Sequence, residues 1–166
     1  MNLVIHDTCV LVDLAQSGLL EFFFRLGIRS MTTSAVVEEI RYESQRQLVE
    51  KFWDKEIQVC SLEGALLVES IELCDRVPAL SIADTSVAVL AKQEAAVLLT
   101  NDRRLRAHCQ SERIEVRGGL WVLDELLRRD VIAPPQALVA LEAMVQGGAR
   151  LPDHEVEVRR ARWGEI

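Results

Sequence analysis

One run of the chain restricts the fold more than any other. Ala95-Ala96-Val97-Leu98-Leu99 is apolar throughout and has the length of a strand. A continuous apolar run indicates a strand that is covered on both faces, as in a parallel sheet whose crossover helices pack on either side. The run therefore predicts a central parallel strand, which ends at the polar sequence Thr100-Asn101-Asp102.

Short strand patterns alternate with helical patterns along the rest of the chain. Further strands are predicted over residues 2–6, 28–31, 57–60 and 114–116. The predicted helices cover residues 8–26, 34–52, 62–74, 81–91, 103–110, 121–129 and 134–146. Within these helices, Leu66, Leu67, Ile71 and Cys74 are expected on one apolar side, and Ile82, Val87, Leu90 and Ala91 are expected to face inward.

This alternation predicts an α/β fold with a mainly parallel sheet of four to five strands. We expect one domain, with its sheet in residues 1–118 and a helical C-terminal extension in residues 119–166. A polar, arginine-rich tail closes the chain, in which Arg159, Arg160, Arg162 and Trp163 could contact nucleic acid or a partner.

Composition excludes several classes of protein. The formal charge is −7, from 26 acidic and 19 basic side chains, which argues against a protein that coats itself with nucleic acid. No apolar run reaches the roughly 20 residues of a membrane span, and the N-terminus lacks the basic region of a signal peptide. The four cysteines are scattered without zinc-site spacing, so we expect buried free thiols and a cytoplasmic protein.

Four acidic residues follow or adjoin the predicted strands. Asp7 follows the first strand and Asp102 the central one, while Asp84 begins the helix before the central strand and Glu39 lies after the second strand. Ligands bind at the carboxyl ends of parallel strands, so these carboxylates can converge. Clustered carboxylates need a cation, and Mg²⁺ or Mn²⁺ suits oxygen ligands and can activate water for phosphodiester cleavage.

Each acid also has a purely structural interpretation. Asp7 and Asp102 can cap the helices that follow them, and Ser81-Ile82-Ala83-Asp84 has the pattern of a capping box. Capping and metal binding do not exclude each other at Asp84. Glu38 and Glu39 point about 100° apart on a helix, so only one of them faces the site, and Glu39 is favoured.

Four stretches resemble the PIN-domain family, in order along residues 2–117. They are Val4-Ile5-His6-Asp7-Thr8, Thr33-Ser34-Ala35-Val36-Val37-Glu38-Glu39-Ile40, Leu80-Ser81-Ile82-Ala83-Asp84 and Leu98-Leu99-Thr100-Asn101-Asp102. The resemblance implies a three-layer α/β/α fold and a metal-dependent nuclease site. It carries Asp7, Glu39, Asp84 and Asp102 into the acidic positions, with Asp7, Asp84 and Asp102 as metal ligands and Thr8 and Thr100 as supporting hydroxyls. Many small prokaryotic members are ribonuclease toxins of VapC type, which a cognate antitoxin holds inactive.

Other side chains near these acids have two interpretations each. Asn101 can orient a metal-bound water or form a turn. Arg103, Arg104 and Arg106 can grip an RNA phosphate or form a solvated helix face. His6 should point away from Asp7 and is taken as structural. Phe22, Phe24 and Trp53 belong to the core or to the interface of a homodimer.

Three functions remain in competition. The leading hypothesis is an Mg²⁺- or Mn²⁺-dependent endoribonuclease, the toxin of a toxin–antitoxin pair. The second is a PIN-like binding module with little or no nuclease activity. The third is phosphoryl transfer through Asp7, but Asp7-Thr8-Cys9 lacks the second aspartate, two residues on, of haloacid-dehalogenase-like phosphatases.

Overall fold

The computed structural model describes residues 2–164 and contains a five-stranded, fully parallel sheet in the order β3-β2-β1-β4-β5. The strands are β1 (Leu3–His6), β2 (Arg29–Thr33), β3 (Ile57–Cys60), β4 (Val97–Leu99) and β5 (Val116–Arg117). Helices flank this sheet, which confirms the predicted α/β class. The central strands β1 and β4 are buried along their whole length, as the apolar run predicted.

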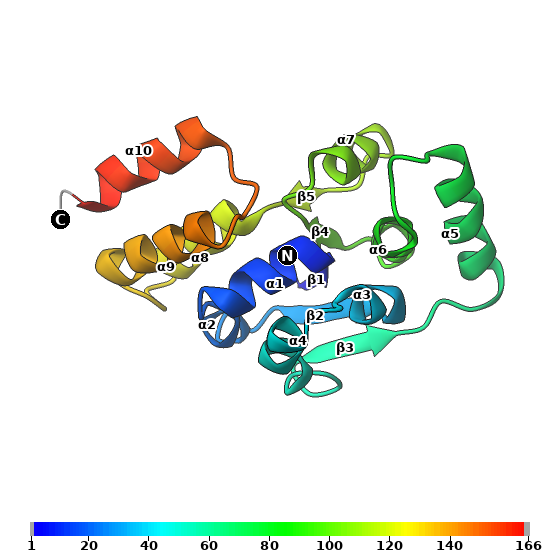
Figure 1. The fold of residues 1–166 in the computed structure, drawn as a ribbon, viewed down its shortest axis with the longest axis horizontal. Coiled ribbons are helices and arrows are strands. Elements are labelled where there is room, and N and C mark those ends of the chain that lie inside the picture. Colours follow the sequence, from blue (N-terminus) through cyan, green and yellow to red (C-terminus); the bar gives the residue numbers. More distant parts are fainter. Residues whose placement is uncertain (1, 165–166) are drawn as a thin grey trace.

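Ten helices connect and extend the sheet within the described residues. They are α1 (Thr8–Gln16), α2 (Leu20–Phe24), α3 (Ser34–Glu39), α4 (Glu43–Glu50), α5 (Gly64–Arg76), α6 (Ile82–Gln93), α7 (Arg103–Ser111), α8 (Gly119–Arg128), α9 (Pro134–Gln146) and α10 (Asp153–Gly164). Figure 1 shows α8, α9 and α10 gathered at one end of the molecule and α5, α6 and α7 at the other, with the sheet between them. Helix α6 packs against β1, β2 and β4.

The strand order has one reversal point, between β1 and β4. The chain moves outward from β1 through β2 to β3, and then crosses back to place β4 on the other side of β1. His6 pairs with Leu99, and the Asp7 amide donates to the Leu99 carbonyl at 3.0 Å. The residues that follow β1 and β4 therefore emerge side by side, and such a reversal point is where ligands bind in open α/β sheets.

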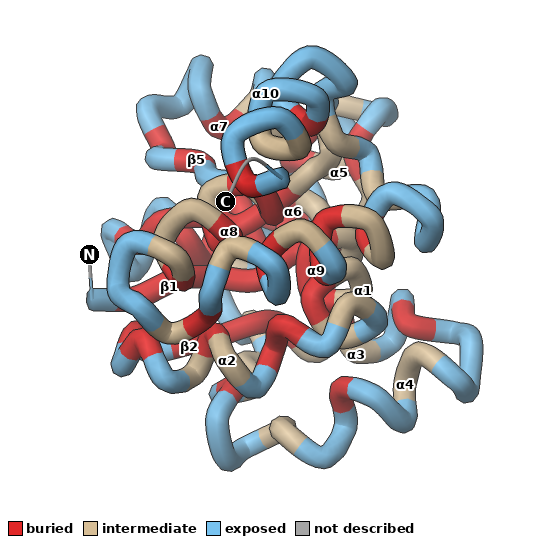
Figure 2. The backbone as a smooth tube through the Cα atoms, turned by 90° about the vertical axis from the view of Figure 1, so that its left-hand side faces the viewer, coloured by how far each residue is buried: buried red, intermediate tan, exposed pale blue. Residues whose placement is uncertain are grey.

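The core surrounds these two strands. Figure 2 shows buried positions through the middle of the molecule, whereas α4 and α10 are largely exposed. Helices α8 and α9 contribute Leu123, Leu126 and Leu141, which are fully buried in the same hydrophobic cluster as Ile5 and Leu98. The C-terminal extension thus shares the core of the sheet and covers α1.

Two predicted helices are each broken in the structure. The helix expected over residues 8–26 is divided into α1 and α2, because Gly18 adopts a left-handed φ of +72° that ends the first helix. The helix expected over residues 34–52 is divided into α3 and α4, since Ile40 leaves the helical region with ψ of 85°. The second piece, α4, ends at Glu50, before Phe52. Both breaks turn the chain so that the second piece still packs on the core.

Two strand positions were shifted in the prediction. The strand expected over residues 28–31 runs from Arg29 to Thr33, and the one expected over 114–116 is Val116–Arg117. Ile114 is instead buried after a left-handed turn at Arg113, where φ is 61°. Apolar character alone set these expected limits, whereas the pairing with β1 and β4 decides the real ones.

The predicted inward face of α5 was wrong. Leu67 and Ile71 are exposed, while Ser70 and Leu73 are buried. The Ser70 hydroxyl lies 3.0 Å from the Thr85 hydroxyl of α6, and this polar contact lets a serine occupy the buried side. Ile82 was also expected to face inward and is exposed, because it lies at the first turn of α6.

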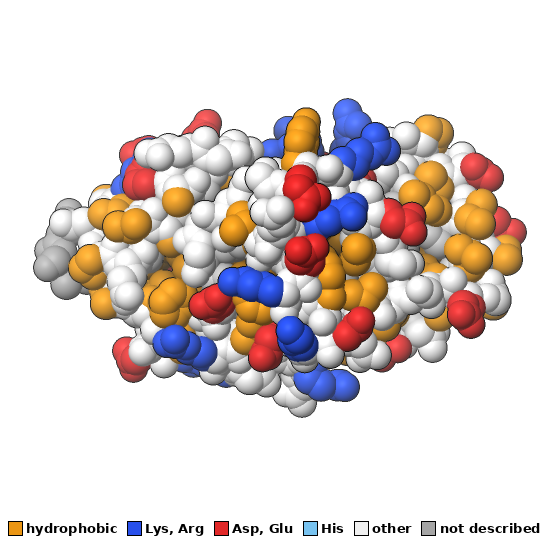
Figure 3. All heavy atoms as spheres, turned by 60° about the horizontal axis from the view of Figure 1, so that its bottom comes forward, with side chains coloured by type: hydrophobic (Ala, Val, Ile, Leu, Met, Phe, Trp, Pro, Cys, Tyr) orange, Lys and Arg blue, Asp and Glu red, His pale blue; other side chains and the backbone are white. Residues whose placement is uncertain are grey.

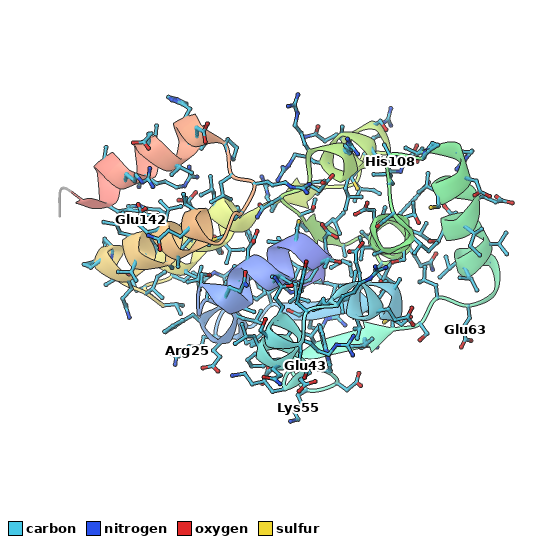
Figure 4. The ribbon with its side chains drawn as sticks, viewed as in Figure 1. Arg25, Glu43, Lys55, Glu63, His108 and Glu142 are labelled. Carbon is cyan, nitrogen blue, oxygen red and sulfur yellow. The ribbon has the colours of Figure 1, made fainter. Side chains whose placement is uncertain are left out.

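The arginine-rich tail forms an ordered helix rather than a free tail. Trp163 and Val156 of α10 are buried in the shared core. Arg160 forms an ion pair with Glu142 at 2.6 Å, and Figure 4 labels Glu142 on α9, the neighbour of α10. Arg159 binds Asp124 of α8. These arginines are therefore engaged within the chain, and Trp163 is not available to nucleic acid.

Candidate functional site

A cleft of about 1370 Å³ opens at the carboxyl ends of β1 and β4. All four predicted acids line it: Asp7, Glu39, Asp84 and Asp102. Its opposite side is formed by the start of α8 and by residues 148–152 between α9 and α10. The reversal in strand order thus brings together acids that are separated by up to 95 residues in the sequence.

Asp7 is the most buried of these acids, with 2% of its surface exposed. One carboxylate oxygen accepts a hydrogen bond from the Thr8 amide at 2.7 Å and caps α1. The other accepts from the Thr100 hydroxyl at 2.7 Å and from the Cys9 thiol at 3.0 Å. Burial raises the pKa of Asp7 to about 6, opposed by these hydrogen bonds and assisted by the charge of Asp84.

Asp84 and Glu39 are linked through Ser81. Asp84 accepts from the Ser81 amide at 2.7 Å, and its own amide donates to the Ser81 hydroxyl at 3.1 Å, so the predicted capping box is present. Burial raises the pKa of Asp84, and the charges of Glu39 and Asp102 raise it further against the opposing Ser81 bonds. Glu39 accepts from the hydroxyls of Thr8 and Ser81. Glu39 lines the cleft, in agreement with the preference for it over Glu38.

Asp102 combines a helix cap with an ion pair. Its Oδ1 atom accepts from the amides of Arg104 and Leu105 at 2.9 and 3.0 Å, at the start of α7. Its Oδ2 atom accepts from Arg150 at 2.6 Å. Sequence reasoning missed Arg150, because it lies 48 residues further along the chain and no local pattern marks it.

Thr100 and Asn101 hold the chain segment that follows β4. The Thr100 hydroxyl donates to Asp7 and accepts from the Asp102 amide at 2.9 Å, so one hydroxyl connects two of the acids. Asn101 donates to Asp13 at 2.8 Å and accepts from the Gly119 amide at 2.9 Å. Asn101 therefore fastens the start of the C-terminal extension to α1, and it also lines the cleft.

Two further carboxylates that the sequence analysis missed line the cleft, Asp13 and Glu155. Burial raises the pKa of Asp13, while the hydrogen bond from Asn101 and the charge of Arg150 lower it. Asp13 follows Cys9 by four residues on α1, so both lie on the same helix face, but the sequence marked neither as a site residue. Cys9 also lines the cleft, and burial holds the pKa of its thiol well above the ordinary value.

The three predicted arginines all line the cleft, but they differ in their contacts. Arg106 donates to the Thr100 carbonyl at 3.0 Å and so holds the segment that follows β4. Burial lowers the pKa of Arg106. Arg103 and Arg104 are exposed at the start of α7. On the face shown in Figure 3, basic and acidic side chains are interspersed rather than gathered by sign.

The oxygen ligands of the cleft fit a hard divalent cation, but their positions in this structure do not form a complete coordination site. The acids offer carboxylate oxygens, which Mg²⁺ and Mn²⁺ prefer. Across residues 2–164, however, no three His, Cys, Asp or Glu side chains are placed to hold one ion. Mutual repulsion contributes to the raised pKa values of Asp7 and Asp84, and a bound cation would relieve it.

Residues outside the cleft have structural roles. His6 is fully buried, its Nε2 atom lies 3.1 Å from the Ser30 hydroxyl, and burial lowers its pKa to about 3. Cys109 is buried as expected, while Cys60 and Cys74 are only partly buried, as is Cys9 in the cleft, and all four are free thiols. Phe22, Phe24 and Trp53 pack against the core. None of the described helices is both long enough and apolar enough to cross a bilayer.

Comparison with known proteins identifies a family for nearly the whole chain. A family model described as a PIN domain matches residues 3–165. No curated protein sequence matches the chain. The matched region includes both the sheet and the helices that follow residue 118.

Proposed function

The chain belongs to the PIN-domain family, and on this premise we propose that it is an endoribonuclease that uses Mg²⁺ or Mn²⁺ to hydrolyse phosphodiester bonds in RNA. The observation that carries the proposal is the cleft at the reversal point of the sheet, where Asp7, Glu39, Asp84 and Asp102 share one opening. Side-chain caps occur at several helices of this structure, but caps from separate helices need not face a common cleft. Their convergence favours a chemical role.

The metal ligands would be Asp7, Asp84 and Asp102. A divalent cation bound there would supply the Lewis acidity that activates water and stabilises the leaving oxygen in phosphodiester cleavage. Thr100 orients Asp7 through its hydroxyl, and Thr8 and Ser81 orient Glu39. With these donors fixed, Glu39 can accept a proton from water at the edge of the cleft.

Substrate attraction would come from the arginines of the cleft rather than from the whole surface. The formal charge of −7 opposes long-range attraction of RNA. Arg103 and Arg104 are exposed beside Asp102 and can donate to phosphate oxygens. Weak, strongly salt-dependent RNA binding is the expected consequence.

The decisive experiment is single-turnover cleavage of an unstructured RNA with and without Mn²⁺. We expect Asp84→Asn and Asp102→Asn to lower the rate at least about 100-fold, since each removes a ligand charge. Asp75→Asn is the matched control, because Asp75 is exposed on α5 and outside the cleft. Metal-dependent cleavage that persists in both cleft variants would refute the proposal.

A binding module with little nuclease activity is the second candidate. It is favoured by one observation, the lack of three suitably placed ligands for a single ion in residues 2–164. The two candidates differ in Mn²⁺ titration followed by electron paramagnetic resonance. Binding at millimolar Mn²⁺ that Asp102→Asn abolishes supports the nuclease, and no binding supports the module.

We also propose that the protein acts as the toxin of a toxin–antitoxin pair, in the cytoplasm and as a homodimer. The support is family membership together with an acidic chain, which suits a basic protein partner. The test is expression alone and together with the product of an adjacent short reading frame. Growth arrest that the neighbour relieves and Asp84→Asn prevents is expected. Equal growth in all cases would contradict the toxin role.

A further inference from the structure

Arg150 is the one cleft arginine whose guanidinium pairs with a proposed metal ligand among the described residues. Its Nη1 atom donates to Oδ2 of Asp102 at 2.6 Å. The other carboxylate oxygen, Oδ1, is occupied by two backbone amides of α7. Oδ2 is therefore the Asp102 oxygen left to a metal, and it is the one that Arg150 holds.

We propose that Arg150 competes with the divalent cation for Asp102, so that the resting protein carries a cation of its own at the metal site. This inference rests on the proposed function, because it assumes that Asp102 binds metal. A guanidinium and a divalent ion cannot share one oxygen without strong like-charge repulsion. Metal binding at this oxygen therefore opposes the Arg150 contact, and Arg150 lowers the affinity for the metal.

The loop between α9 and α10 places the Arg150 side chain at the cleft. Gly148 adopts a left-handed φ of +83° after the end of α9 and turns the chain towards the cleft. Ala149 and Leu151, on either side of Arg150, pack against the hydrophobic core. The backbone of the loop is thus anchored while the side chain between the anchors points into the cleft.

The ion pair between Arg150 and Asp102 is exposed to solvent and is therefore easily broken. The Arg150 side chain is 73% exposed and that of Asp102 is 19% exposed. Exposed ion pairs are weak, because water and salt screen them. Asp13 lies near enough for the charge of Arg150 to lower its pKa. A displaced guanidinium would therefore keep an anionic neighbour within the same cleft.

The test is Mn²⁺ binding, measured by electron paramagnetic resonance on the full chain at low salt without RNA. We expect Arg150→Gln to bind Mn²⁺ about 2- to 5-fold more tightly than wild type, which is the strength of an exposed ion pair. Arg150→Lys should lie between them. Arg103→Gln removes a positive charge from the same cleft without contacting the Asp102 carboxylate, so its Mn²⁺ affinity should stay close to that of wild type.

The outcomes separate this inference from the proposed function. Tighter binding in Arg150→Gln but not in Arg103→Gln supports the competition. Unchanged or weaker binding in Arg150→Gln, or an equal gain in both variants, overturns it while leaving a metal-dependent nuclease intact. If neither wild type nor any variant binds Mn²⁺, the proposed function fails and the competition fails with it. Circular dichroism checks that each variant is folded.

Discussion

Replacing Asp7 by asparagine should stabilise the metal-free protein while removing its activity. Asp7 has a pKa of about 6 in the folded protein against an ordinary value of 3.8, mainly because it is buried. At about 1.36 kcal/mol per pH unit, this difference makes the ionised carboxylate cost about 3 kcal/mol of folding free energy at pH 8. Asparagine is neutral and has nearly the same shape, so it removes that cost.

Part of this gain is lost with the hydrogen bonds of Asp7. An asparagine Oδ1 can still accept from the Thr8 amide. Its NH₂ group cannot accept from the Thr100 hydroxyl or from the weaker Cys9 thiol donor, a loss of about 1 kcal/mol. We therefore expect Asp7→Asn to raise the free energy of unfolding by about 2 kcal/mol and the melting temperature by about 4–8 °C.

The pH dependence gives the sign of the effect independently. The folded protein binds the Asp7 proton more tightly than the unfolded chain does, so wild type loses stability as pH rises through 6. At pH 5 the difference between variant and wild type should be about 1.4 kcal/mol smaller than at pH 8. Asp75→Asn, an exposed control, should show neither the gain nor this change with pH.

Urea denaturation in EDTA at pH 8 and pH 5 measures these differences. Added Mn²⁺ should stabilise wild type and leave Asp7→Asn unaffected, because only a protein that binds the ion gains from it. A variant that is less stable than wild type at pH 8, or a difference that does not change with pH, would refute the reasoning. In either case burial would not be the main influence on Asp7.

Two further variants test how the C-terminal extension is attached. In Gly118→Ala a Cβ atom would lie 2.8 Å from Oδ1 of Asn101 and 2.9 Å from Arg106, so we expect a loss of about 1–3 kcal/mol by urea denaturation. In Trp163→Ala the cavity left under α10 should cost about 3 kcal/mol, measured in the same way. An exposed residue of the same helix, Val158, gives the control Val158→Ala, which should cost less than about 1 kcal/mol.

The sequence predicted those parts of the fold that depend on local chemistry. The apolar run at residues 95–99 and the capping box at Ser81 identified β4 and the start of α6, which the structure contains. Helix breaks were predicted less well: Gly18, a local signal, ends α1 with a left-handed turn, and Ile40, an apolar residue that fits a helix pattern, ends α3. The face of α5 was predicted wrongly, since the buried contact of Ser70 depends on a residue of the next helix.

The residues of the candidate site also fall into those that local sequence predicted and those that depend on tertiary packing. Four acids were predictable because their places after or beside strands imply one edge of a parallel sheet. Asp13 was missed, because the only cleft residue one helical turn before it, Cys9, was not predicted to line the site. Arg150 was missed as well, since it approaches Asp102 only through the packing of α8 and α9 on α1 and the turn at Gly148.

Capping and metal binding are best understood as two uses of the same carboxylates. Asp7, Asp84 and Asp102 each accept a backbone amide at the start of a helix, respectively α1, α6 and α7. Three helix N-termini therefore face the cleft, and their positive ends offset part of the repulsion between its acids. The fold can hold an acidic cluster before any metal arrives, because the amides and Arg150 stabilise the charges. Each cap uses one oxygen of its carboxylate, while the second oxygen accepts from Thr100 and Cys9 at Asp7 and from Arg150 at Asp102. The starts of three helices thus allow the fold to bring Asp7, Asp84 and Asp102 together in one cleft.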